Sequence, residues 1–245
     1  DFLHFSNGGA RVHWSIGPTL YTADTRGVYG GDYKAPTAGI GLSQTVRAAK
    51  PTGSVALTGA RIVTMRGADG GIIEDGVILI QGDRIAAIGA RGSVAVPAGT
   101  PTVDVTGKTI VPGFIDAHAH GSQGENGLVP QQNWSTMANL ALGTTTIHDP
   151  SNRATEIFAA AEMQRAGLIL APRIFSTGEI IYGAKAAGVF AEIGKYDDAL
   201  AHVRRLKAQG AMSVKNYNQP RREQRQMVVA AAQAENMLVV PEGGS

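Results

Sequence analysis

The chain has 245 residues, 43% of them hydrophobic, so it is long enough and apolar enough to bury a core. Its 32 glycines favour many short strands and turns, and its formal charge of +2 comes from scattered Lys and Arg, which excludes the basic surface of a nucleic-acid-binding protein. It has no Cys and no apolar run of about 18 residues, which excludes thiolate metal ligands and predicts no membrane span.

Residues 1–50 predict a β-hairpin followed by a linker. In the run FLHFSNGGARVHWSIGPTLY, short aromatic and β-branched stretches flank an Asn-Gly-Gly turn. The run resembles the end of a Tol-type, WD-like β-propeller, and a generic exposed hairpin is the alternative. The propeller resemblance implies a periplasmic or secreted protein, while the sequence leaves a cytoplasmic location open.

Residues 51–108 predict a small β-sandwich with a structural role. β-Branched runs in VALTGARIVTM, GVILIQGDRIAAIG and TVDVTGKTIVPG are separated by Gly-Asp and Thr-Gly turns. The alternation over residues 77–80 and 85–88, on either side of Gly82-Asp83, predicts a hairpin with one buried face.

Residues 109–245 predict an α/β architecture, because strand patterns alternate with helical ones. The expected strands are 109–116, 144–148, 173–176, 213–216 and 238–240, and the expected helices are 134–142, 154–166, 198–209 and 222–234. Five such units predict either an open doubly wound sheet or part of a (β/α)8 TIM-type barrel. No Gly-rich nucleotide-binding motif follows the first strand, so we favour the partial barrel.

Both ends of the sequence indicate a fragment. The chain begins with Asp1 rather than Met, and it stops at Gly244-Ser245, directly after an apolar strand-like run. We therefore expect a longer protein, with any targeting signal outside this chain.

The strongest chemical signal is the pair His118 and His120 in TIVPGFIDAHAHG. In a strand, residues two apart point to the same side, so the two imidazoles are expected to share one metal ion, and Asp116 has the same parity. Imidazole suits Zn, Fe, Ni or Mn, and strand ends of a barrel collect catalytic groups. Two histidines with a purely structural role are the alternative.

The same run, together with GTTTIHDP, resembles the amidohydrolase superfamily. The resemblance extends from the predicted β-sandwich to the end of the chain. It implies that the sandwich is built around the barrel and that His118 and His120 bind the first metal. It also implies a metal-dependent hydrolase that acts on C–N bonds of amide, cyclic amide or peptide-like substrates.

Lys215, in GAMSVKNYN, lies at the expected end of the fourth strand. Apolar surroundings make an unmodified ammonium costly to bury, so it needs compensation. The prolidase-like and hydantoinase-like branches of the superfamily imply a carboxylated lysine here that bridges two metals. The alternative is an unmodified lysine at the rim that pairs with a nearby acid.

The fifth strand departs from the superfamily pattern, since Pro241-Glu242 stands where many members carry a metal-binding His. Glu242 is expected to be either an oxygen ligand, which would favour harder metals such as Mn, or a substrate or loop residue. The expected cofactor is a divalent metal, first of all Zn, as one or two ions. The superfamily's later His and its general acid/base Asp would lie beyond Ser245.

Four further residues are candidates for substrate binding, with a loop or solvated role as the alternative: His148, Glu179, Tyr182 and Arg221. His4, His13 and His202 are expected to be structural. The partner is a small-molecule or peptide-like substrate, and homo-oligomer formation stays open.

Other functions on the same scaffold stay open, because a barrel does not specify a reaction. One is a metal-assisted deaminase or phosphoesterase. Another is a degenerate, non-catalytic binding protein that has lost its metals, for which Glu242 is the hint.

Overall fold

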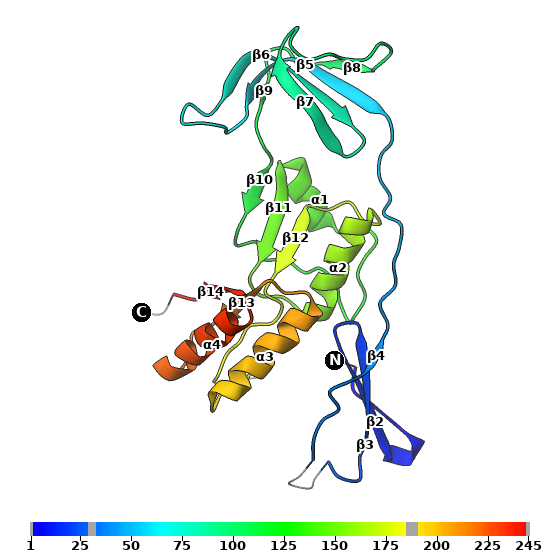
Figure 1. Ribbon diagram of the computed structural model, residues 1–245, viewed down its shortest axis with the longest axis vertical. Helices are drawn as coiled ribbons and strands as arrows, with labels where there is room; N and C mark the ends of the chain where they lie inside the picture. Colours follow the sequence, from blue (N-terminus) through cyan, green and yellow to red (C-terminus); the bar gives the residue numbers. More distant parts are fainter. Residues whose placement is uncertain (1, 29–32, 185–190, 244–245) are drawn as a thin grey trace. The chain divides into compact units, whose positions relative to one another are not determined.

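The computed structural model of the chain describes residues 2–28, 33–184 and 191–243 (Figure 1). Its internal contacts separate two compact units: Asp1–Arg47 with Ile115–Ser245, and Ala48–Phe114. The three segments expected from the sequence, 1–50, 51–108 and 109–245, stay a prediction. None of the helices in the described ranges is long and apolar enough to cross a lipid bilayer.

The N-terminal residues form an antiparallel sheet of four strands, larger than the expected hairpin. Its strands follow chain order: β1 (His4–Ser6), β2 (Arg11–Ile16), β3 (Thr19–Asp24) and β4 (Ile40–Gly41). The Asn-Gly-Gly turn joins β1 to β2, and Gly8 adopts a φ of 65° there, which glycine allows without strain. His13 bonds Ser6 and Thr22 on the neighbouring strands, which agrees with a structural role. The propeller resemblance stays a prediction.

The unit Ala48–Phe114 contains a single five-stranded sheet in the part of the chain that the structure describes. Its strands are β5 (Ser54–Val63), β6 (Ile72–Gln81), β7 (Arg84–Ala90), β8 (Thr102–Asp104) and β9 (Thr109–Ile110). The predicted hairpin is present as β6 and β7, which pair antiparallel across the Gly82-Asp83 turn. Ala60, Ile62 and Ile78 form the buried core on this sheet. The second layer of the expected sandwich stays a prediction.

The prediction of one strand over residues 109–116 is wrong, because the structure has two short strands there. β9 pairs with β5 in one unit, whereas β10 (Phe114–Asp116) joins the sheet of the other unit. Pro112 lies between them, and a proline has no N–H to donate to a strand ladder.

The remaining strands follow the expected parallel order. β10, β11 (Thr144–Asp149) and β12 (Arg173–Ser176) form one sheet, and β13 (Ser213–Asn216) pairs parallel with β14 (Leu238–Pro241). Ile181 joins the two groups through a parallel bridge to Asn216, and its N–H donates to the Lys215 carbonyl at 2.9 Å. The α/β prediction is confirmed.

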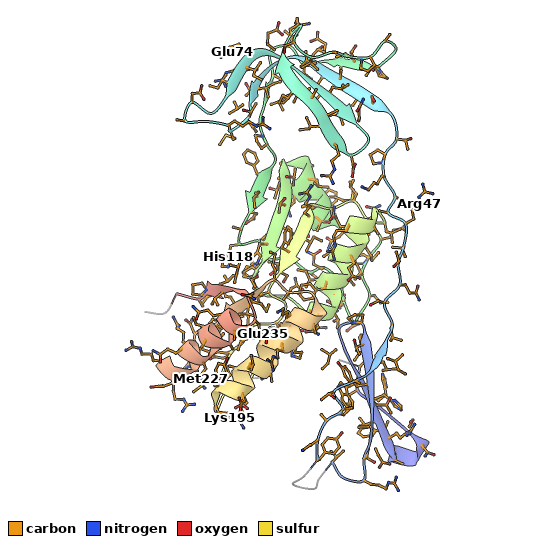
Figure 2. All side chains as sticks on the ribbon, viewed as in Figure 1. Arg47, Glu74, His118, Lys195, Met227 and Glu235 are labelled. Carbon is orange, nitrogen blue, oxygen red and sulfur yellow. The ribbon has the colours of Figure 1, made fainter. Side chains whose placement is uncertain are left out.

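The helices begin and end within two residues of the expected positions. They are α1 (Trp134–Ala141), α2 (Ala154–Ala166), α3 (Tyr196–Gln209) and α4 (Arg222–Ala234). Gly167 ends α2 in the left-handed conformation, at a φ of 74°. α3 and α4 lie side by side, and Glu235, labelled in Figure 2, bonds Arg204 and Lys207 of α3.

The buried apolar residues of this unit form two clusters. One contains Val203 and Leu206 of α3 with Val214 of β13, and the other contains Ile147 of β11 with Ile157 of α2. α2 and α3 therefore pack against β11 and β13 through apolar side chains.

Candidate metal centre

The four residues predicted to bind metal lie at the C-terminal ends of their strands. His118 and His120 follow β10, Lys215 lies in β13 and Glu242 follows β14. The hydrogen bond from Lys215 is the main cause that lowers the pKa of Glu242, and the charges of His118 and His120 lower it further. The structure thus pairs His118 with His120 and Lys215 with Glu242, each pair near the C-terminal ends of its strands, which is the position where barrel enzymes carry their active sites.

The two histidines lie in a turn rather than in a strand, which corrects the argument from strand parity. β10 ends at Asp116, whose Oδ1 accepts a hydrogen bond from the His118 N–H at 3.0 Å. Asp116 therefore stabilises the turn. The His118 and His120 rings meet edge to face with their centroids 5.0 Å apart, so they are close enough to share an ion (Figure 2 labels His118).

The neighbouring strand β11 fixes this turn. The Ala119 N–H, between the two histidines, donates to the His148 carbonyl at 3.0 Å. Asp149, the next residue of β11, is fully buried, and its Oδ1 lies 3.5 Å from Nδ1 of His120. The backbone of the turn and the His120 ring thus lie against the end of β11.

Lys215 is buried, with 2% of its side chain exposed, and its ammonium forms an ion pair with the Glu242 carboxylate. The backbone supports this pair, since the Glu242 N–H donates to the Asn216 carbonyl at 3.0 Å. An unmodified Lys215 therefore has the compensating charge that its burial requires. This matches the alternative in which the lysine pairs with a nearby acid.

His148 bridges two strand ends. Its Nε2 lies 2.8 Å from the Ser213 hydroxyl on β13, and its side chain also bonds the backbone of Ala117. Burial lowers the pKa of His148 and is the largest effect on it. The hydrogen bond to Ala117 acts in the opposite direction and raises the pKa. Its predicted contact with substrate stays a prediction.

Two of the predicted substrate residues line a cavity of about 860 Å³. Glu179 and Tyr182 belong to its wall, together with Tyr217, whose ring meets that of Tyr182 edge to face at 5.3 Å. The Glu179 carboxylate is already engaged, because it accepts from the first N–H of α2 at Ala154 and pairs with Arg205. A carboxylate at this position also stabilises the helix dipole.

Arg221 lies away from that cavity. It lines a separate hollow of about 590 Å³ with Gly183, Asp198 and Gln224, and its Nη2 lies 3.4 Å from the Ile193 carbonyl. The structure therefore does not bring Arg221 together with Glu179 and Tyr182.

Sequence reasoning missed two residues of the site, Ser213 and Asn152. Strand parity would have indicated Ser213, because it lies two residues before Lys215 and so shares its face. Asn152 donates both to the Gly121 carbonyl and to Asp149, at 2.7 Å each, and no local pattern indicates such a bond.

The residues present fit part of a metal site. Two imidazoles and a carboxylate are donors that a divalent ion such as Zn accepts. Within residues 2–28, 33–184 and 191–243, however, no group of three or more His, Asp or Glu side chains converges closely enough to form a complete site. The Glu242 carboxylate is instead paired with the Lys215 ammonium.

Comparison with known proteins adds sequence relatives. No family model matches the chain. An imidazolonepropionase of Ruegeria sp. (strain TM1040) is 48% identical over 67 residues, which covers 26% of this chain and 16% of the relative. A 5-methylthioadenosine/S-adenosylhomocysteine deaminase of Pelotomaculum thermopropionicum is 39% identical over 72 residues, 28% of this chain and 16% of the relative. An N-substituted formamide deformylase of Arthrobacter pascens is 51% identical over 47 residues, 18% of this chain and 8% of the relative.

Solved structures share the fold. Phenylurea hydrolase B superposes with a TM-score of 0.62 at 20% identity, over 78% of this chain and 55% of that one. A Xaa-Pro dipeptidase with bound methionine gives a TM-score of 0.58 at 19% identity, over 77% of this chain and 56% of that one. The chain thus spans about half the length of these structures, whose fold is TIM-barrel-like. The chain is thus similar in sequence to an imidazolonepropionase and a deaminase over about a quarter of its length, and similar in fold to structures of the amidohydrolase type.

Proposed function

We propose that the chain forms part of a metal-dependent hydrolase that acts on C–N bonds of small-molecule or peptide-like substrates. The placement of His118, His120, Lys215 and Glu242 at or just after the C-terminal ends of their strands supports the proposal. The names of the relatives support it, because an imidazolonepropionase, a formamide deformylase and a phenylurea hydrolase are among them.

In this proposal His118 and His120 bind a divalent cation, with Zn as the first candidate, and Glu242 supplies an oxygen ligand. Such an ion would lower the pKa of a bound water to near neutrality and polarise the carbonyl beside the scissile C–N bond. The β11 strand end keeps the two imidazoles in place, because the Ala119 N–H is bonded to its backbone.

Lys215 decides whether a second ion binds. As an ammonium it holds Glu242 in an ion pair. A carboxylated Lys215 would be an anion next to the Glu242 carboxylate, and this arrangement requires a cation between the two. We therefore propose that carboxylation of Lys215 and binding of a second ion occur together.

The cavity beside Tyr182 and Tyr217 is the proposed substrate pocket. Its two aromatic edges suit an apolar or planar substrate group, while Glu179 supports the wall through its bond to α2. His148 would support the strands through its bond to Ser213, and Arg221 would bind a substrate carboxylate only in the separate hollow that it lines.

Replacement of the imidazoles tests the proposal. In the purified protein that contains this chain, His118→Ala and His120→Ala should each remove bound zinc and C–N bond hydrolysis, because two of three ligands cannot hold the ion. Metal analysis and amide hydrolysis are the measurements. His13→Ala is the matched control, since His13 bonds only within the N-terminal sheet, and it should retain zinc. Full zinc content in both site variants would overturn the proposal.

A deaminase is the second candidate, because one relative is named as a 5-methylthioadenosine/S-adenosylhomocysteine deaminase. A substrate panel of amides, aminopurines and phosphotriesters separates hydrolysis of amides from deamination and phosphoester cleavage. Turnover of aminopurines without turnover of amides would favour the deaminase. A protein that binds no metal and turns over no member of the panel would be a binding protein.

A further inference from the structure

Asp149 is the buried carboxylate of this region that the proposed function leaves unused. It is fully buried, and a charged group pays a large desolvation cost there unless donors surround it. Its Oδ1 accepts from the Ser151 N–H at 2.9 Å, and its Oδ2 accepts from the Asn152 side chain at 2.7 Å. These bonds fix the orientation of the carboxylate before any ligand binds.

The same carboxylate faces the metal-binding turn. Its Oδ1 lies 3.5 Å from Nδ1 of His120, whose side chain is 57% exposed. Asn152 extends the contact, because its amide also donates to the Gly121 carbonyl at 2.7 Å, directly after His120. On the other side of His120, the Ala119 N–H donates to the His148 carbonyl. Backbone on both sides of the imidazole is thus tied to β11 and the residues that follow it.

We propose that Asp149 is a positioning residue that keeps the proton of neutral His120 on Nδ1 and so leaves Nε2 free for a metal ion. A carboxylate accepts hydrogen bonds only, so the nitrogen that faces it has to carry the proton. A partner of this kind sets the tautomer and ring orientation of a metal-binding histidine. The inference rests on the metal centre proposed above, and Asp149 itself is not a ligand in it.

A purely structural role predicts something different. Ser176, which lies opposite Asp149 in the register of β11 and β12, has such a role. Its hydroxyl accepts a hydrogen bond from the backbone N–H two residues later, at Gly178, at 2.9 Å, and Asp149 accepts the equivalent bond from Ser151. Ser176 is also buried. Asp149 differs from Ser176 in its charge, in its bond to Asn152 and in the imidazole beside it.

The tautomer of His120 is the direct test, and it needs no metal. Long-range ¹H–¹⁵N correlation spectra of the metal-free wild-type protein, near pH 8, report which ring nitrogen carries the proton, and His120→Gln assigns the signal. We expect the Nδ1–H form at His120. The Nε2–H form, or an equal mixture of both forms, overturns the proposal.

The zinc affinity provides the second test, measured by competition with a chromophoric chelator. Asp149→Asn should weaken zinc binding by about 10–100-fold, because an amide oxygen cannot accept from Ser151, Asn152 and His120 together. Ser176→Ala loses the equivalent turn bond and should leave the affinity unchanged. An equal loss in both variants, or none in Asp149→Asn, overturns the positioning role.

A third variant, Asn152→Ala, tests the proposal if Asp149→Asn does not fold. It keeps the Asp149 carboxylate but removes the hydrogen bonds of Asn152 to Oδ2 of Asp149 and to the Gly121 carbonyl. It should give a smaller loss of zinc affinity and a mixed His120 tautomer, and wild-type values for both overturn the proposal. A wild-type protein that binds no zinc would instead overturn the proposed function, since the tautomer is read without metal.

Discussion

The two halves of the candidate metal centre are built on opposite principles. At the ends of β10 and β11, the exposed imidazoles of His118 and His120 meet edge to face, and His120 lies beside the buried Asp149 carboxylate. At the ends of β13 and β14, a buried ammonium and a carboxylate neutralise each other. In the proposed centre, the first half would accept a cation directly, whereas the second half would have to exchange its internal cation for a metal. Binding of metal to the whole centre therefore depends on the Lys215 pair.

The largest effect is expected from breaking this pair on one side only. Glu242→Gln leaves the Lys215 ammonium buried without a countercharge, which is strongly destabilising, so the melting temperature should fall clearly. Lys215→Met removes the buried charge and keeps the apolar length, so the melting temperature should stay equal or rise. Thermal unfolding followed by circular dichroism compares the two. Equal losses in both variants would contradict the difference between the halves.

Acid should weaken the same pair, with an effect of intermediate size. Because Lys215 lowers the pKa of Glu242 from its ordinary 4.5, the carboxylate releases its proton more readily in the folded chain. Its contribution to stability is fully present above pH 4.5 and is lost as the pH falls through the lower, folded pKa. Unfolding by urea at pH 3 to 7 should show this loss in the wild type and not in Lys215→Met.

The smallest effect is expected where the two halves meet. Ser213→Ala removes the hydroxyl that bonds His148 and should lower the free energy of unfolding by about 0.5–1.5 kcal/mol. Ser135→Ala, at an exposed helix start, is a control for loss of a hydroxyl. Urea unfolding measures both, and an unchanged free energy in Ser213→Ala would show that His148 does not join the strands.

Some of this could be predicted from the sequence. The helices 154–166 and 222–234 have the expected bounds, because apolar spacing and stop signals such as Gly167 act locally. Pairing of Lys215 with a nearby acid was one of the two alternatives that the sequence left open, and the structure identifies that acid as Glu242.

Other features required the structure. The strand 109–116 divides at Pro112 because its first part pairs with β5, and such long-range pairing leaves no local signal. The turn that presents His118 and His120 depends on a bond from Asp116 to the backbone two residues later. The hydrogen bonds of Asn152 join segments that are distant in sequence, which no periodicity reveals.

The exposure of His120 has a kinetic consequence. More than half of its side chain meets solvent, while the carboxylate beside it is buried. In the proposed centre, an ion bound at His120 would lie at an exposed side chain beside a buried carboxylate, so it could enter or leave while the chain stays folded. Exchange of that ion would then be set by its collision with the turn and by the strength of its bonds, and it would not wait for global unfolding.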